Sequence, residues 1–166
     1  MKRTNLILAL GVVLIIVGML SCQQKAQGPA ELSQADSAAV NQVLDSMINA
    51  YTNGNADLAS SSMAENAVNM EYDRIYRGAE QIRSDHLKKE IELYSVTIYD
   101  VDGRVIRGRD GIAYTYERNI IEFKAKEGKT FYADSCWASS VLEKQADGAW
   151  KIVQLHFSGP MNWAQK

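Results

Sequence analysis

The second half of the chain most constrains the fold, because four long stretches in it alternate apolar and polar residues. They span residues 94–107, 112–124, 130–143 and 150–158. A period of two is typical of half-buried strands. The segments "GRDG", "KEGK" and "QADG" between them carry the glycine and aspartate of hairpin turns. The pattern predicts an antiparallel meander, with a bulge or turn in its first stretch at Asp102-Gly103.

The first half of the chain predicts helices. Apolar residues from Val40 to Tyr51 recur at helical spacing, and Ser33 and Asp36 have the spacing of a capping box. A short second helix is expected across residues 58–63.

A third helix is expected over residues 79–92, where His86 lies beside the charged "LKKE" and is predicted to be solvated. Before it, "AVNMEYD" alternates as a half-buried strand with Val68, Met70 and Tyr72 on the apolar side. Helices first and a meander afterwards predict an α+β domain, with the helices packed on one face of a curved sheet.

The N-terminus indicates export. A basic start at Lys2 and Arg3 precedes an apolar run of fifteen residues, shorter than the ~20 residues of a membrane-spanning helix. The run ends in "MLSCQQ", which resembles a bacterial lipoprotein signal in which Cys22 is acylated. Residues 1–21 are therefore expected to be a signal peptide. We expect a lipid-anchored protein of the bacterial cell envelope, on the periplasmic side of the outer or inner membrane.

Composition sets further bounds on the mature chain. Residues 22–32 read as a flexible tether, residues 33–160 as one domain and residues 161–166 as a tail. The whole chain has a formal charge of −2, the mature form without Lys2 and Arg3 is at about −4, and neither carries a basic cluster, which argues against nucleic acid as a partner. With Cys22 acylated, Cys136 is left without a disulfide partner, and no cysteine or histidine group has zinc-ligand spacing. We expect no cofactor and no metal.

Three segments carry a family resemblance. "AYTNGNADLASSSMAENAVNM", "IYRGAEQIRSDHLKK" and "DGAWKIVQLHFSGP" are similar to the SnoaL-like branch of the nuclear-transport-factor-2-like superfamily. The resemblance covers residues 34–160. It implies a cone-shaped, cystatin-like roll in which a curved antiparallel sheet wraps around three N-terminal helices and encloses a cavity. The fold hosts enzymes, binding proteins and assembly domains, so it does not decide the function.

The alternation predicts which side chains line that cavity. On the last strand, Gln154 and His156 share a face with Trp150 and Ile152. If Lys144 pairs with Ala149, Trp137 pairs with His156 and Ser139 with Gln154. All four side chains then point to the same side of the sheet. The other predicted ligand-binding residues are Tyr51, Met70, Tyr72, Tyr116 and Arg118.

Two points in this assignment remain open. A four-residue "KEGK" loop brings Tyr116 and Arg118 onto the face of Trp137, whereas a five-residue loop brings Thr115 and Glu117; we favour the first. His156 either faces a ligand or braces the end of its strand.

The opposite face of the last strand, with Val153, Leu155 and Phe157, is too apolar to leave in water, and we expect it to form a homodimer. Three functions stay open. The domain binds a small, largely apolar molecule, or it is an isomerase, cyclase or hydratase with His156 as acid–base, or it is a non-catalytic oligomerisation module. We favour the first.

Overall fold

The computed structural model describes residues 31–71, 73–127 and 131–159, and the unit that starts at Glu31 is described by itself. The expected signal peptide, the acylation site Cys22, the tail and Tyr72 lie outside the described residues. Within the described part, no helix is both long enough and apolar enough to cross a membrane.

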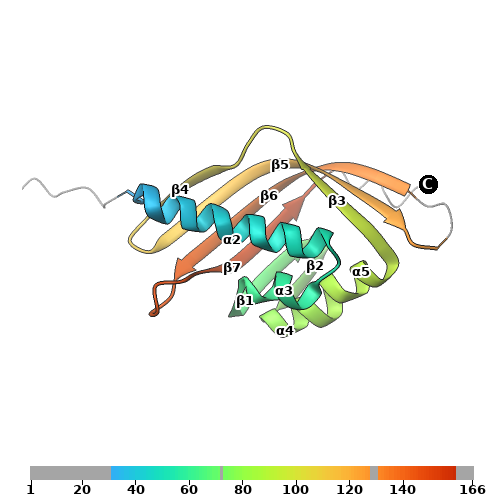
Figure 1. The fold of residues 1–166 in the computed structure, drawn as a ribbon, viewed down its shortest axis with the longest axis horizontal. Helices are drawn as coiled ribbons and strands as arrows, with labels where there is room; N and C mark the ends of the chain where they lie inside the picture. Colours follow the sequence, from blue (N-terminus) through green and yellow to red (C-terminus); the bar gives the residue numbers. More distant parts are fainter. Residues whose placement is uncertain (1–30, 72, 128–130, 160–166) are drawn as a thin grey trace, which may run out of the picture. The chain divides into compact units, whose positions relative to one another are not determined.

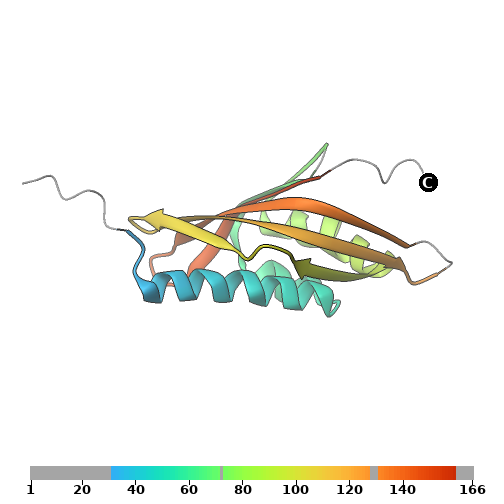
Figure 2. The same ribbon diagram turned by 90° about the horizontal axis from the view of Figure 1, so that it is seen from above.

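The helices pack along one face of the sheet (Figures 1 and 2). They are α2 (Gln34–Thr52), α3 (Ala56–Ser61), α4 (Ala79–Gln81) and α5 (Lys88–Leu93), with a π-helical turn (Ile82–Leu87) that joins α4 to α5. The side chain of Ser33 accepts a hydrogen bond from the backbone N–H of Asp36, so the predicted cap begins α2. Asn55 caps α3 in the same way through the N–H of Leu58.

Among the residues that the structure describes, seven strands form one open sheet. They are β1 (Met63–Glu71), β2 (Arg74–Arg77), β3 (Tyr94–Asp100), β4 (Val105–Arg109), β5 (Ile112–Ala125), β6 (Phe131–Lys144) and β7 (Trp150–Ser158). Their order is β2-β1-β7-β6-β5-β3, and β4 also pairs with β5. The expected α+β fold is confirmed. The sheet is mixed rather than antiparallel throughout, since β1 runs parallel to β7, and the strand β2 was not predicted.

The favoured register between β5 and β6 is confirmed, since Tyr116 pairs with Ser139 and Arg118 with Trp137. The register between β6 and β7 differs from the prediction, because the turn pairs Lys144 with Trp150.

A bulge on β7 then changes which side chains point inward. Leu142 pairs with Ile152 but Val141 pairs with Gln154, so Val153 is the extra residue. An extra residue reverses the alternation. Trp150, Ile152 and Leu155 are all buried on the helix-covered side, hereafter the inner face.

The core lies between the helices and this inner face. Val40 and Leu44 of α2, Ile82 of the π-helical turn, and Leu142 and Ile152 of the sheet are fully buried. Burying each such side chain contributes about 1.5–3 kcal/mol. The core holds α2 against the sheet and so fixes the wall of the cavity described below.

Candidate functional site

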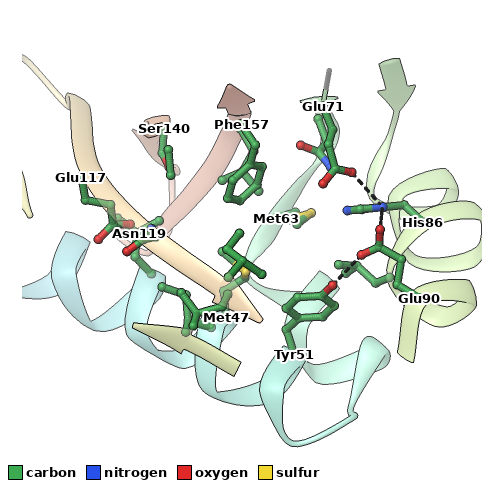
Figure 3. Close-up of a pocket in the computed structure, with 18 of the residues that line it drawn as sticks. Met47, Tyr51, Met63, Glu71, His86, Glu90, Glu117, Asn119, Ser140 and Phe157 are labelled. Carbon is green, nitrogen blue, oxygen red and sulfur yellow. Dashed lines mark hydrogen bonds and ion pairs between the residues drawn. The ribbon is translucent and has the colours of Figure 1, made fainter. Parts of the chain in front are cut away.

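A largely apolar cavity lies between α2 and the inner face of the sheet (Figure 3). Its apolar wall includes Leu44, Met47, Ile48, Met63, Ile121 and Phe157. The centre of a water molecule can occupy a volume of about 40 Å³ inside it, and this volume is room for about three waters. The two methionines are flexible side chains that can move for a larger guest.

Polar side chains gather at two ends of this cavity. Figure 3 shows Tyr51, Glu71, His86 and Glu90 at one end, and Glu117, Asn119 and Ser140 at the other. We call the first group the Glu–His–Glu end and the second, together with Arg104, the Arg104 end. Their chemistry differs.

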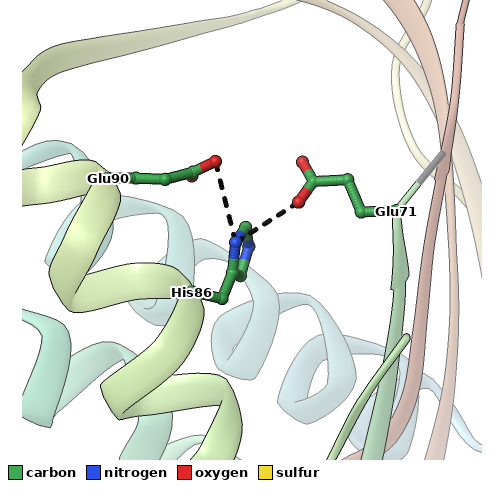
Figure 4. Close-up of side chains that lie close together, drawn as sticks. All are labelled: Glu71, His86 and Glu90. Atoms are coloured by element: carbon green, nitrogen blue, oxygen red, sulfur yellow. Dashed lines mark ion pairs between the residues drawn. The ribbon is translucent and has the colours of Figure 1, made fainter. Parts of the chain in front are cut away.

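The Glu–His–Glu end is a chain of close contacts. The Nδ1 atom of His86 lies 3.3 Å from Oε2 of Glu71 and 3.7 Å from Oε1 of Glu90 (Figure 4). The hydroxyl of Tyr51 donates to Oε2 of Glu90 at 2.5 Å. The imidazole stacks on Tyr76, with 4.9 Å between the ring centroids. One imidazole therefore faces two carboxyl groups, and one of these is oriented by a phenol.

Three elements position this end. Tyr51 lies in the last turn of α2, and Glu71 is the last residue of β1. His86 is on the π-helical turn and Glu90 follows four residues later in α5, a spacing that places both on one helix face. A single π-helical turn within an α-helix is frequent at functional sites.

Burial sets the protonation of the group. It raises the pKa of Glu71 to about 8, with the negative charge of Glu90 adding to the rise and Arg74 opposing it. Burial also lowers the pKa of His86, against the influence of Glu90. At neutral pH Glu71 therefore keeps its proton and His86 is neutral. The close contact between them therefore joins two neutral groups rather than an ion pair.

The same three side chains have a spacing that could hold a metal ion. Glu71, His86 and Glu90 each offer a ligand atom, and these atoms lie within 4.8 Å of one another. Imidazole and carboxylate are ligands that first-row divalent ions accept.

At the Arg104 end the buried carboxyl has a cation beside it. The Nε atom of Arg104 lies 2.9 Å from Oε2 of Glu117, and both side chains are less than a tenth exposed. The guanidinium also donates to Asp45 at 2.8 Å and to Oδ1 of Asn41 at 2.7 Å. Burial raises the pKa of Glu117, and Arg104 opposes that rise. Arg104 therefore joins Asn41 and Asp45 of α2 to Glu117 of β5.

The predicted ligand residues are distributed between two faces. Tyr51 lies in the cavity wall, as expected. The other predicted ligand residues on the strands were expected to face the cavity, and this expectation was wrong. The residues that the register brings together on the outer face, away from the cavity, are Tyr116, Arg118, Trp137, Ser139, Gln154 and His156. Met70 lies beside His156 in the pairing of β1 with β7.

The expectation for the dimer surface is reversed in the same way. Leu155 and Phe157 line the cavity, and Val153 is the bulged residue. Large exposed side chains of the outer face include Ile112, Tyr114, Tyr116, Ile120 and Trp137.

Sequence reasoning missed Glu71, His86 and Glu90. One sequence signal could have found the inner face. Asn69-x-Glu71 on β1 and Glu117-x-Asn119 on β5 each place an amide and a carboxyl two residues apart within a strand, and all four line the cavity. Such a repeated pair is unusual on a buried face and indicates a polar site.

The geometry defines an α+β domain whose sheet and helices enclose a polar-ended cavity, and the comparisons give its family. The family model of the SnoaL-like domain matches residues 40–162, and the chain belongs to that family. No curated protein matches the chain.

Solved structures share the fold at low sequence identity. A nuclear transport factor 2-like superfamily protein from Salmonella enterica serovar Typhimurium is 15% identical with a TM-score of 0.68, over 76% of this chain and 94% of that one. A putative ketosteroid isomerase from Shewanella frigidimarina is 24% identical with a TM-score of 0.60, over 72% and 94%. A putative scytalone dehydratase from Novosphingobium aromaticivorans is 8% identical with a TM-score of 0.68, over 76% and 85%. At these identities the likeness shows the fold alone.

Proposed function

We propose that the domain binds a small, largely apolar carbonyl compound in the cavity and transfers a proton on it at the Glu–His–Glu end. One observation carries the proposal. A protonated carboxyl, a neutral imidazole and a second carboxyl that accepts from Tyr51 meet at the end of an apolar cavity. Paired titratable groups whose surroundings drive their pKa values apart are typical of acid–base sites. The names of two structural neighbours, an isomerase and a dehydratase, agree with this class.

The roles follow from the protonation. Glu71 donates its proton in a hydrogen bond to the carbonyl oxygen of the ligand. Glu90, held by Tyr51, accepts a proton from the carbon next to that carbonyl. The electron pair of the broken C–H bond forms a C=C bond, and the carbonyl oxygen takes the proton of Glu71 as the enol forms. His86 lies between both carboxyls and relays a proton from Glu90 back to Glu71. If the proton on Glu90, whose side chain is 27% exposed, is replaced from water before the steps reverse, reversal at the same carbon exchanges hydrogen, and reversal at another carbon moves a double bond.

The size of the cavity limits the ligand. Room for about three waters, extended by movement of Met47 and Met63, suits a single ring or a short chain. We therefore take cyclopentanone as the probe.

The test is hydrogen exchange at the carbons next to the carbonyl of cyclopentanone in D₂O, followed by proton NMR. The wild-type chain should catalyse deuterium uptake, and Glu90→Gln should lower the rate by about 10²–10⁴-fold. Glu122→Gln, at a half-buried position of β5 outside the cavity wall, is the matched control and should keep the rate. EDTA should have no effect. Uptake no faster than in buffer would contradict proton transfer, and bound ketone without uptake would reduce the domain to a binding protein.

The anchor is proposed from the sequence alone. The apolar run before Cys22 supports acylation of that cysteine and attachment to a membrane of the bacterial cell envelope. Incorporation of labelled palmitate in cells, lost in Cys22→Ser, would support it, and unchanged labelling in that variant would contradict it.

A homodimer is proposed through the outer face. Tyr114, Tyr116 and Trp137 form a patch of neighbouring aromatic side chains on β5 and β6, each about half exposed. Exposed apolar patches of this kind mark interaction surfaces. Light scattering should give twice the chain mass at micromolar concentration, and a monomer there would contradict the proposal.

A further inference from the structure

Asn69 is a buried polar residue in the middle of β1 that the proposed chemistry does not use. Its side chain is 1% exposed and lies in the cavity wall. Its Oδ1 atom has no hydrogen-bond partner among the described residues. A buried acceptor without a donor costs free energy, and native proteins keep few of them. The cavity therefore contains a place for a hydrogen-bond donor.

The neighbours of Asn69 do not supply that donor. In the row of paired residues across the sheet, Asn69 lies between Tyr76 on β2 and Leu155 on β7, and Ser140 follows on β6. Leu155 offers only an apolar side chain there. Ser140 is two strands away, about 10 Å at the usual spacing of strands, which is beyond hydrogen-bond reach.

The distance to the Glu–His–Glu end limits the guest further. Asn69 and Glu71 are two residues apart on the same face of one strand, so their side chains leave the sheet about 7 Å apart. Phe157 pairs with Glu71 and Leu155 with Asn69, so an apolar side chain lies beside each of the two polar groups. A molecule that meets both groups has polar substituents at opposite ends of an apolar body of about one ring.

We infer that Asn69 selects ligands that carry a hydroxyl or N–H group, which donates to its Oδ1 while an oxygen at the other end meets Glu71. This inference rests on the proposed binding function of the cavity. The ligand class is a small monocyclic or short-chain molecule with a hydrogen-bond donor at one end and a carbonyl at the other. Asn69 is a specificity residue, and it takes no part in the proton transfer.

The test compares three probes of similar size on the full chain by calorimetry: phenol, which donates; anisole, which only accepts; and toluene, which does neither. Phenol should bind the wild-type chain at least about tenfold more tightly than either of the others. Asn69→Leu should remove that preference by weakening phenol binding and sparing toluene. Asn66→Leu, at an exposed position of the same strand, should leave all three affinities unchanged.

The outcomes distinguish a failure of the inference about Asn69 from a failure of the proposed function. If the three probes bind equally, or anisole matches phenol, the donor requirement is overturned while the binding cavity stands. If Asn69→Leu keeps the preference for phenol, an ordered water already satisfies Oδ1 and the inference fails. If no probe binds, the inference fails, and hydrogen exchange on cyclopentanone decides separately whether the proposed function fails with it. The comparison on the wild-type chain decides the donor requirement even where Asn69→Leu does not fold.

Discussion

The two faces of one sheet differ in a way that reverses the usual arrangement. The inner face carries buried carboxyl and amide groups, among them Asn69, Glu71 and Glu117. The outer face carries half-exposed aromatic rings such as Tyr116 and Trp137. Polar groups on a buried face are expensive unless they have partners or a use. The comparison agrees with the two proposals that the inner face holds a ligand and that the outer face meets a second copy of the chain.

The two histidines give the sharpest contrast. The chain has two, His86 at the inner cavity and His156 on the outer face beside Ser139. We predict that His86→Gln lowers exchange on cyclopentanone by about 10²-fold or more and that His156→Gln leaves it within twofold. NMR exchange rates measure both. Equal losses in the two variants would erase the functional distinction between the faces.

The ion pair of Arg104 on the inner side and that of Arg118 on the outer face give the next largest contrast. Arg104→Leu leaves Glu117 buried without its cation, and we predict a loss of about 3–5 kcal/mol in the free energy of unfolding. Arg118→Leu removes the half-exposed pair with Asp102 on the outer face and should cost less than about 1 kcal/mol.

Urea denaturation measures both losses. In the double variant Arg104→Leu/Glu117→Leu, most of the stability should return, because no charge is left buried. Similar losses for the two single variants would mean that the inner pair is not buried in solution.

A third contrast separates association from binding. Trp137→Ser removes an aromatic side chain from the outer face, and we predict a dissociation constant for the dimer at least about tenfold higher. Cyclopentanone binding in the cavity should not change. Sedimentation equilibrium and calorimetry give the two values, and a change in ligand affinity without a change in association would contradict the assignment of faces.

The last expected effect is on the pH dependence of stability. The pKa of Glu71 is about 8 in the folded chain and 4.5 in its reference state, so the folded chain binds more protons between these values. Its free energy of unfolding should therefore fall as pH rises from about 4.5 to 8, by at most about 1.4 kcal/mol per pH unit. Urea titrations of wild type and Glu71→Gln at several pH values measure this. The same slope in both would show that another group is responsible.

Local patterns predicted the elements well. Helical periodicity predicted α2. The four-residue loop that we assumed at "KEGK" predicted the register that pairs Tyr116 with Ser139. The bulge at Val153 left no trace in the alternation, because Val153, Leu155 and Phe157 read as one apolar face of a regular strand. A single extra residue therefore moved Leu155 and Phe157 into the cavity and His156 out of it.

The site was harder to predict than the fold for two physical reasons. We assigned the more apolar face to the interior, and here that face points outward with Tyr114 and Trp137. The charged residues after His86 also predicted a solvated side chain, whereas the π-helical turn buries both His86 and Leu87. The contact of His86 with Glu71 joins residues of a helix and a strand, and no local pattern encodes it.

The most direct test of the account is NMR of the two imidazole rings in the ¹⁵N-histidine-labelled chain during titration with cyclopentanone. With only two histidines, His156→Gln assigns both sets of signals. The account predicts saturable shifts of the His86 ring while the His156 ring stays unchanged. Shifts confined to His156 would place the ligand on the outer face and contradict the central claim.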